Sequence, residues 1–188
     1  MGYTQGINFI VGYLIIIGYS DQDVFWIFIQ LAIHPNYLLL GLFEDSFPLS
    51  NVYMSIFKRI LKRLNPKLYH HLIEKHELPD SIWIFKWFIT YYLYSFPIEV
   101  CKYIFELVIN LRQGGIGLVY FAIGLINSLE EQLLQLEDQS DISLFFQDLK
   151  ELEYFNEIVQ INRVMLFAYN INLTEDDLQD VLKDSFYG

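Results

Sequence analysis

The spacing of apolar residues constrains this chain more than any other feature. The first run places Ile7, Ile10, Val11, Leu14 and Ile15 at the i, i+3, i+4, i+7 and i+8 positions of one helix face. Similar runs follow, separated by Gly, Pro and short polar links, and no stretch alternates apolar and polar residues over a useful length. The pattern predicts an all-α fold.

Breaks in the apolar pattern divide the chain into a series of predicted helices. We expect them at about 9–19, 24–33, 51–64, 70–76, 81–94, 98–110, 118–136, 144–152 and 154–169, with a last one capped by Thr174. Ser20 and Asp23 have the spacing of a capping box before the second helix. The 81–94 segment carries aromatic residues on every side, Trp87 among them, so we expect a central helix there.

Composition limits the classes of protein that fit. The chain has 188 residues, 54% of them apolar, which suits one domain or a large piece of one. Its single cysteine, Cys101, excludes an internal disulfide. The net charge of −11 arises from residue 127 onward, where three basic residues stand beside fourteen acidic ones, so nucleic acid is not an expected partner.

Two uncharged stretches raise the question of a membrane-spanning segment. Residues 1–20 hold only about a dozen apolar residues, and residues 24–43 are interrupted by His34-Pro35-Asn36. Both fall short of the roughly 20 apolar residues that a span needs. We therefore expect no transmembrane segment, and a small helical membrane protein is the least favoured class.

Two clusters of polar residues have more than one interpretation. His70 and Glu74 share one side of a helix, but no third ligand accompanies them, so a polar face is favoured over a metal site. Five of the twelve basic residues lie between Lys58 and Lys67. A solvated face is favoured for them, with an acidic partner or a membrane surface as the alternative.

Short landmarks in the sequence point to a family. They occur in this order: Tyr3-Thr4-Gln5-Gly6 before an aliphatic helix, Asp23-Val24-Phe25-Trp26, Tyr37 to Glu44 with its Gly-Leu-Phe, Trp87-Phe88-Ile89-Thr90, and Ser95-Phe96-Pro97. Their order and spacing resemble the TBC domain, the catalytic domain of Rab GTPase-activating proteins. The resemblance covers the second half of such a domain, which we place at residues 1–152, followed by acidic C-terminal helices at 153–188.

The resemblance implies a function and a site. The chain would activate a Rab-family GTPase in its GTP form, as a regulator that contributes catalytic residues rather than as an enzyme in its own right. Gln5 would be the catalytic residue, a glutamine supplied in trans to position the hydrolytic water. Tyr3, Gly6 and Asn8 would contact the GTPase. No metal site or cofactor is expected, because GTP and Mg²⁺ belong to the partner, and the protein would be cytoplasmic, peripherally associated with endomembranes in vesicle trafficking.

The chain departs from the family pattern in two places. Tyr103-Ile104-Phe105-Glu106 stands where the family usually has Arg-Ile-Trp-Asp. The family's arginine finger lies in an Ile-x-x-Asp-x-x-Arg motif before the glutamine, and no Asp of this sequence has that context. The alternative is therefore a GTPase-binding module that does not catalyse hydrolysis, and we expect little activation from these 188 residues alone.

Overall fold

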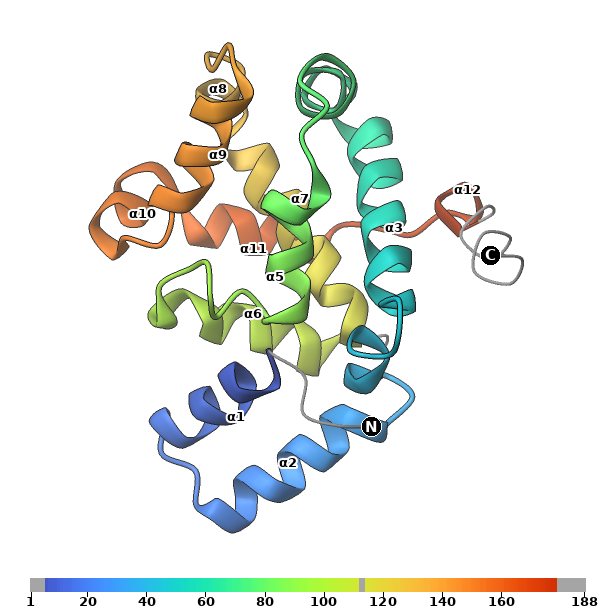
Figure 1. The fold of residues 1–188 in the computed structure, drawn as a ribbon, viewed down its shortest axis with the longest axis vertical. Helices are drawn as coiled ribbons and strands as arrows, with labels where there is room; N and C mark the ends of the chain where they lie inside the picture. Colours follow the sequence, from blue (N-terminus) through green and yellow to red (C-terminus); the bar gives the residue numbers. More distant parts are fainter. Residues whose placement is uncertain (1–5, 112–113, 179–188) are drawn as a thin grey trace.

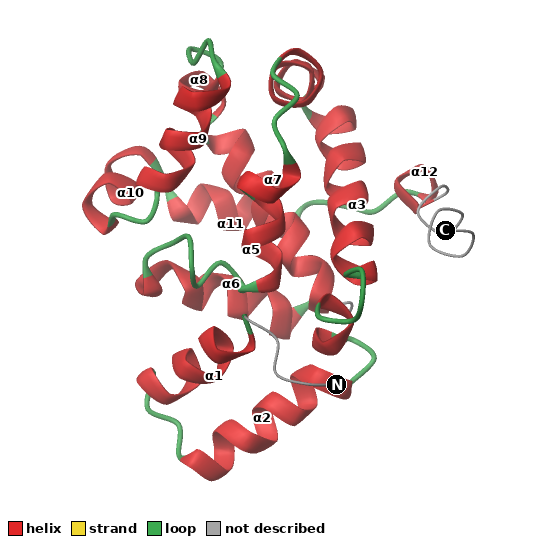
Figure 2. Cartoon of the chain, viewed as in Figure 1, coloured by secondary structure: helices red, strands yellow, loops and turns green. Residues whose placement is uncertain are grey.

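Helices are the only regular secondary structure in the computed structural model, which describes residues 6–111 and 114–178 (Figures 1 and 2). The all-α prediction is confirmed. The longer helices are α1 (Ile7–Ile16), α2 (Asp21–Ile33), α3 (Pro48–Leu64), α6 (Ile98–Asn110), α7 (Gly117–Ser128), α9 (Gln139–Asp148) and α11 (Ile161–Tyr169). The shorter ones are η1 (Leu39–Leu42), α4 (Pro66–Tyr69), the π-helix η2 (His70–Lys75), η3 (Asp80–Ile82), α5 (Ile84–Ile89), η4 (Gly114–Ile116), α8 (Glu130–Leu133), α10 (Leu152–Ile158) and α12 (Glu175–Leu178).

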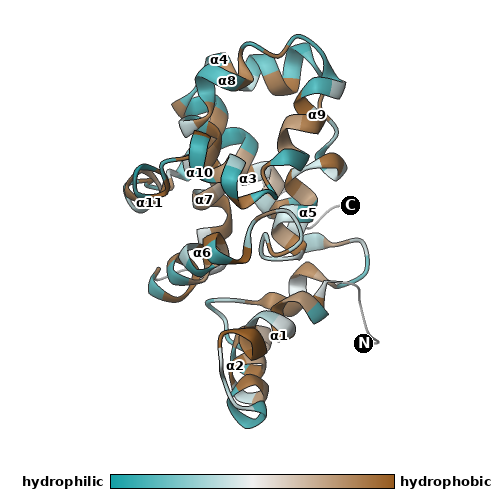
Figure 3. Ribbon diagram, turned by 90° about the vertical axis from the view of Figure 1, so that its left-hand side faces the viewer, coloured by the Kyte–Doolittle hydropathy of each residue, from teal (hydrophilic) through white to brown (hydrophobic). Residues whose placement is uncertain are grey.

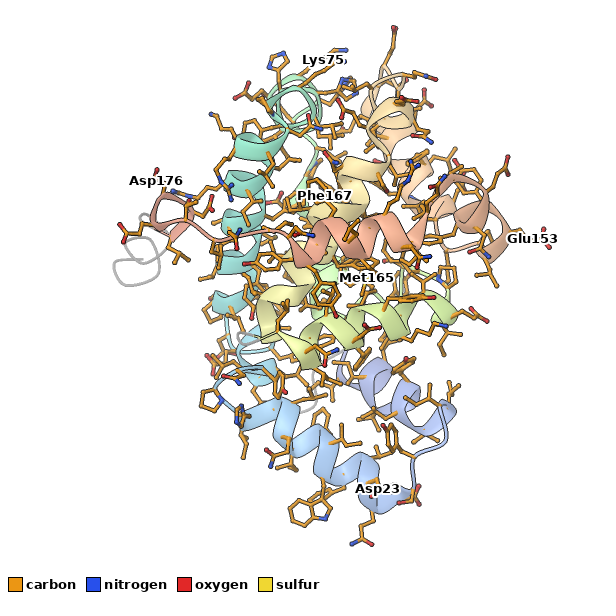
Figure 4. The ribbon with its side chains drawn as sticks, turned by 180° about the vertical axis from the view of Figure 1, so that it is seen from behind. Asp23, Lys75, Glu153, Met165, Phe167 and Asp176 are labelled. Carbon is orange, nitrogen blue, oxygen red and sulfur yellow. The ribbon has the colours of Figure 1, made fainter. Side chains whose placement is uncertain are left out.

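Helix α7 is the centre of the core. Its first ten residues, 117–126, are all buried, and it packs against α3, α6 and α11 (Figure 1). A Cβ on Gly124 would lie 2.6 Å from the carbonyl oxygen of Val164, so the glycine permits the close approach of α11. Met165 and Phe167 lie on that crossing helix, which is seen from behind in Figure 4.

The aromatic segment forms a shorter helix than the sequence predicts. Helix α5 ends at Ile89, and Tyr91 and Tyr92 then adopt positive φ angles of 49° and 66°. Such angles are costly for non-glycine residues. The turn is stabilised by burial of both rings and by a 2.6 Å hydrogen bond that the Tyr92 hydroxyl donates to the carbonyl oxygen of Leu118.

Trp87 lies in the core, as the sequence predicts. Its side chain is 1% exposed, and its ring centroid lies 5.2 Å from that of Phe96 and 5.4 Å from that of Phe146. Phe105, which takes the place of the family's Trp, is also buried and stacks on Tyr13 with ring centroids 4.6 Å apart. The substitution of Phe for Trp therefore still fills the core.

Helices α1 and α2 form a pair at one end of the molecule (Figures 1 and 3). The Ser20 hydroxyl accepts a hydrogen bond from the backbone N–H of Asp23, which confirms the predicted cap of α2. This pair leaves large apolar side chains in solvent, with Ile16 70% and Trp26 57% exposed. Large apolar side chains that gather on an exposed surface are typical of a site that another molecule or segment covers.

Across the two stretches that the structure describes, no helix is both long enough and apolar enough to cross a bilayer.

Candidate functional site

The loop that opens α1 is fixed by close contacts at Gly6. This residue is the N-cap of α1, is buried, and has a φ angle of 123° that side-chain-bearing residues rarely adopt. A Cβ at this position would lie 2.9 Å from Cε1 of Phe43 and 3.0 Å from the carbonyl oxygen of Ile89. Both the angle and the space therefore require glycine.

Three landmarks that are far apart in the sequence thus meet at one point. Gly6 belongs to the Tyr-x-Gln-Gly segment, Phe43 to the Gly-Leu-Phe segment at the end of η1, and Ile89 to the Trp-Phe-Ile-Thr segment at the end of α5. The strained turn at Tyr91 and Tyr92 begins two residues after Ile89. Sequence reasoning identified these segments separately but did not foresee that they converge, because chain order carries no information about distance.

Asn8 stabilises the same loop and remains accessible. Its side-chain oxygen accepts a hydrogen bond from the backbone N–H of Gly6 at 3.2 Å, while the residue itself is exposed. The backbone N–H of Phe9 donates to the carbonyl oxygen of Gly6 at 3.1 Å, which closes the first turn of α1. The loop therefore presents Asn8 to solvent from a fixed backbone.

The structure bears differently on the four residues singled out from the sequence. Gln5 and Tyr3 lie outside the described residues. Gly6 and Asn8 are both in the fixed loop, but the close neighbours of Gly6 are Phe43 and Ile89 of its own chain. The roles of all four residues toward a GTPase stay predictions.

The buried tyrosines behind the loop are structural. Burial raises the pKa of Tyr91 and of Tyr92 well above the ordinary value of a phenol. Both are therefore neutral at physiological pH and serve as packing groups rather than as acids or bases. The thiol of Cys101 is also buried, which raises its pKa to about 12 and keeps it unreactive.

His70 and Glu74 lie on an exposed polar face, as favoured from the sequence, whereas His71 is buried. Nδ1 of His70 lies 2.8 Å from Oε2 of Glu74. Within residues 6–111 and 114–178, no group of three or more His, Cys, Asp or Glu side chains is placed to hold a metal ion.

The basic side chains of α3 have partners within the chain, while Lys62 and Arg63 remain exposed to solvent as the sequence predicts. Lys58 pairs with Asp80 at 2.7 Å, and Lys62 lies 3.7 Å from Glu74. Arg63 forms an ion pair with Asp177 at 2.8 Å, and Arg59 donates to the backbone carbonyl of Asp176 at 3.0 Å. The two arginines therefore contact the chain's own C-terminal segment, and the two lysines contact carboxylates between α3 and α5.

Comparisons with known proteins agree with the landmarks. The family model of the Rab-GTPase-TBC domain matches residues 1–134. The chain is 29% identical over 177 residues to the GTPase-activating protein GYP5 of Saccharomyces cerevisiae, covering 94% of this chain and 17% of that protein. It is 31% identical to GYP5 of Eremothecium gossypii, covering 73% of this chain and 16% of the relative.

A human relative matches as well. The ecotropic viral integration site 5 protein homolog of Homo sapiens is 26% identical over 146 residues, covering 77% of this chain and 17% of the relative. The chain thus spans about a sixth of the length of these proteins. From the family match, which covers most of the chain and includes the Gly6 loop, we conclude that this chain belongs to the Rab-GTPase-TBC domain family.

Proposed function

We propose that this chain contributes to the acceleration of GTP hydrolysis by a Rab-family GTPase and that Gln5 positions the hydrolytic water. The 188 residues alone should accelerate hydrolysis little, because they contain no arginine-finger motif. The observation that supports the proposal is the convergence at Gly6. Contacts from Phe43 and Ile89 fix the backbone immediately after Gln5, and Asn8 holds the same turn through its hydrogen bond. A catalytic side chain needs such a rigid base, because loss of position by about 1 Å can cost a hundredfold in rate.

The chemistry of the reaction suits an amide at this position. Hydrolysis requires a water in line with the γ-phosphate and donors for the phosphoryl oxygens as charge develops on them. The amide of Gln5 can accept a hydrogen bond from that water and donate one to an oxygen at the same time. Its contribution would be made in the transition state, so it would act on rate more than on ground-state affinity.

A second candidate is a module that binds the GTP form of a Rab without accelerating hydrolysis. It is favoured by the lack of an Ile-x-x-Asp-x-x-Arg motif anywhere in the sequence. An arginine finger contributes about 10³–10⁵ in rate to GTPases that use one. The two candidates predict different affinities for the transition state of the reaction.

The experiment measures binding of the chain to a panel of Rabs in two nucleotide states. One state carries a non-hydrolysable GTP analogue and the other carries GDP with aluminium fluoride, which mimics the phosphoryl group in the transition state. A catalytic chain binds the aluminium fluoride state more tightly, whereas a binding module shows equal affinity for both. Failure to bind any Rab in either state would contradict both candidates.

A further inference from the structure

A hollow of about 800 Å³ lies beside α5, and we call it the lysine hollow. Its lining includes Lys86 and Trp87 of α5, Tyr94 and Ser95 of the next turn, Phe146 of α9, and Lys150. Trp87 and Phe146 are buried, while both lysines are exposed. The hollow therefore has an aromatic floor and two cationic groups at its surface.

The two lysines of the hollow have no carboxylate partner among the described residues, unlike the lysines Lys58 and Lys62 of α3. None of the described residues that line the hollow is acidic, although Asp148 and Glu151 stand close to Lys150 in the sequence. Neither Lys86 nor Lys150 makes an ion pair in the described part of the chain. In a protein with a net charge of −11, the lining of the hollow thus carries two basic side chains and no acidic one.

Direct contacts connect the lysine hollow to the Gly6 loop. Phe9, in the first turn of α1, packs edge-on against Tyr94 with ring centroids 5.8 Å apart. The ammonium group of Lys150 lies over the same Tyr94 ring, 5.2 Å from its centroid. In Figure 1 the turn that carries Tyr94 lies between α1 and α10. The first turn of α1, which carries Asn8, is therefore linked to the lysine hollow through the contact between Phe9 and Tyr94.

We infer that the lysine hollow receives acidic side chains of the GTPase partner, next to the Gly6–Asn8 loop. This inference rests on the proposed function. A protein partner suits the hollow better than an anionic membrane, because recruitment to lipid typically uses clusters of four to eight basic residues and this site has two. The two lysines serve association, so they increase affinity and the association rate and do not touch the reacting atoms.

The test uses charge reversal in the 188-residue chain. Lys86→Glu and Lys150→Glu are made singly and together, with Lys75→Glu as the control. Lys75 is also exposed and has no ion pair in the described residues, and it lies at the end of the molecule opposite Asp23 of α2 (Figure 4). Thermal unfolding of each variant verifies that the fold is retained.

Affinity and association rate are measured with a GTP-analogue-loaded Rab that binds the parent chain, at 50 and 200 mM NaCl. Each reversal of charge should weaken binding about three- to tenfold, mostly through the association rate, and the control should bind like the parent. Because the attraction is electrostatic, the double variant should also lose most of the salt dependence of binding.

Three results would overturn the inference. If the parent binds no Rab, the proposed function fails together with it. If the parent binds and the double variant retains the same affinity and salt dependence, the role proposed for the lysine hollow is wrong and the proposed function stands. Binding to phosphatidylserine vesicles that the double variant loses, with Rab binding unchanged, would instead assign the lysines to a membrane.

Discussion

Arg63 and Asp177 form a two-point ion pair that joins α3 to the C-terminal segment. Nη2 of the arginine lies 2.8 Å from one carboxylate oxygen and Nε lies 3.2 Å from the other. Burial would raise the pKa of the Asp177 carboxyl, but hydrogen bonds from Arg63 and Thr174 outweigh it and lower the pKa. The pair joins the basic helix α3 to the acidic C-terminal segment.

Removal of the guanidinium tests the strength of this connection. Arg63→Ala should lower the free energy of unfolding by about 1–3 kcal/mol, because it removes hydrogen bonds to a nearly buried carboxylate. Lys62→Ala is the matched control, since the ion pair of Lys62 with Glu74 is exposed and should contribute less than about 1 kcal/mol. Urea unfolding measures both, and equal losses in the two variants would contradict a special role for Arg63.

Gly6 should tolerate no side chain. Gly6→Ala introduces a Cβ against Phe43 and Ile89 at a φ angle of 123°, so the loop must shift and the chain should lose stability and affinity for a Rab. Gly12→Ala in the same helix is the control, because a Cβ there meets nothing within 4 Å and alanine favours the helix. Thermal unfolding and Rab binding are measured, and a Gly6→Ala chain that behaves like Gly12→Ala would show that the convergence is not required.

Trp87 should be among the most costly core residues to truncate. Its ring contacts Trp83, Tyr92, Phe96 and Phe146, all within 5.6 Å between centroids. Trp87→Ala should lower the free energy of unfolding by about 3–5 kcal/mol by leaving a cavity. Chemical denaturation gives the value, and a loss below about 1 kcal/mol would mean that this cluster does not stabilise the core.

The sequence predicts most helices and their approximate positions, because the helices are amphipathic or because their caps depend on residues close together in the sequence. The Ser20 cap depends on residues three apart and was predicted correctly. The end of α5 was not, because Trp87 and its neighbours are strong apolar residues and only tertiary packing stabilises the positive φ angles of Tyr91 and Tyr92.

The candidate site shows the same division. The glycine and its neighbours are recognisable as a short motif, but the contact of Gly6 with Ile89 depends on how α1 and α5 pack. The ion pair between Arg63 and Asp177 joins residues 114 positions apart, and no local pattern indicates it. Sequence reasoning therefore predicted that this face is exposed but not which residues of the chain pair with it.

His71 should make the stability of the chain depend on pH near neutrality. Burial, followed by the charges of His76 and Lys75, lowers the pKa of His71 below its ordinary value of 6.5. The unfolded chain therefore binds this proton at a higher pH than the folded chain, and the free energy of unfolding should fall as the pH drops below about 6.5.

Urea midpoints at pH 7.5 and 5.5 measure this effect. The chain's many carboxylates also respond to pH, so the comparison is with His71→Gln, which should show a smaller loss on acidification than the parent. His70→Gln is the control, because the side chain of His70 is exposed. This variant should keep the loss of stability on acidification that His71 causes in the parent. Equal pH dependence in the parent and His71→Gln would contradict the predicted titration.

The role of Gln5 is tested most directly by its removal in a Rab complex with GDP and aluminium fluoride. Gln5→Ala should weaken binding to this transition-state mimic at least tenfold and leave binding to the GTP-analogue complex almost unchanged, while Gln22→Ala, a surface control on α2, should change neither. Under conditions where hydrolysis is accelerated, the single-turnover rate should fall by about 10²-fold in the same variant. A Gln5→Ala chain that binds both complexes like the parent would contradict a catalytic role for this glutamine.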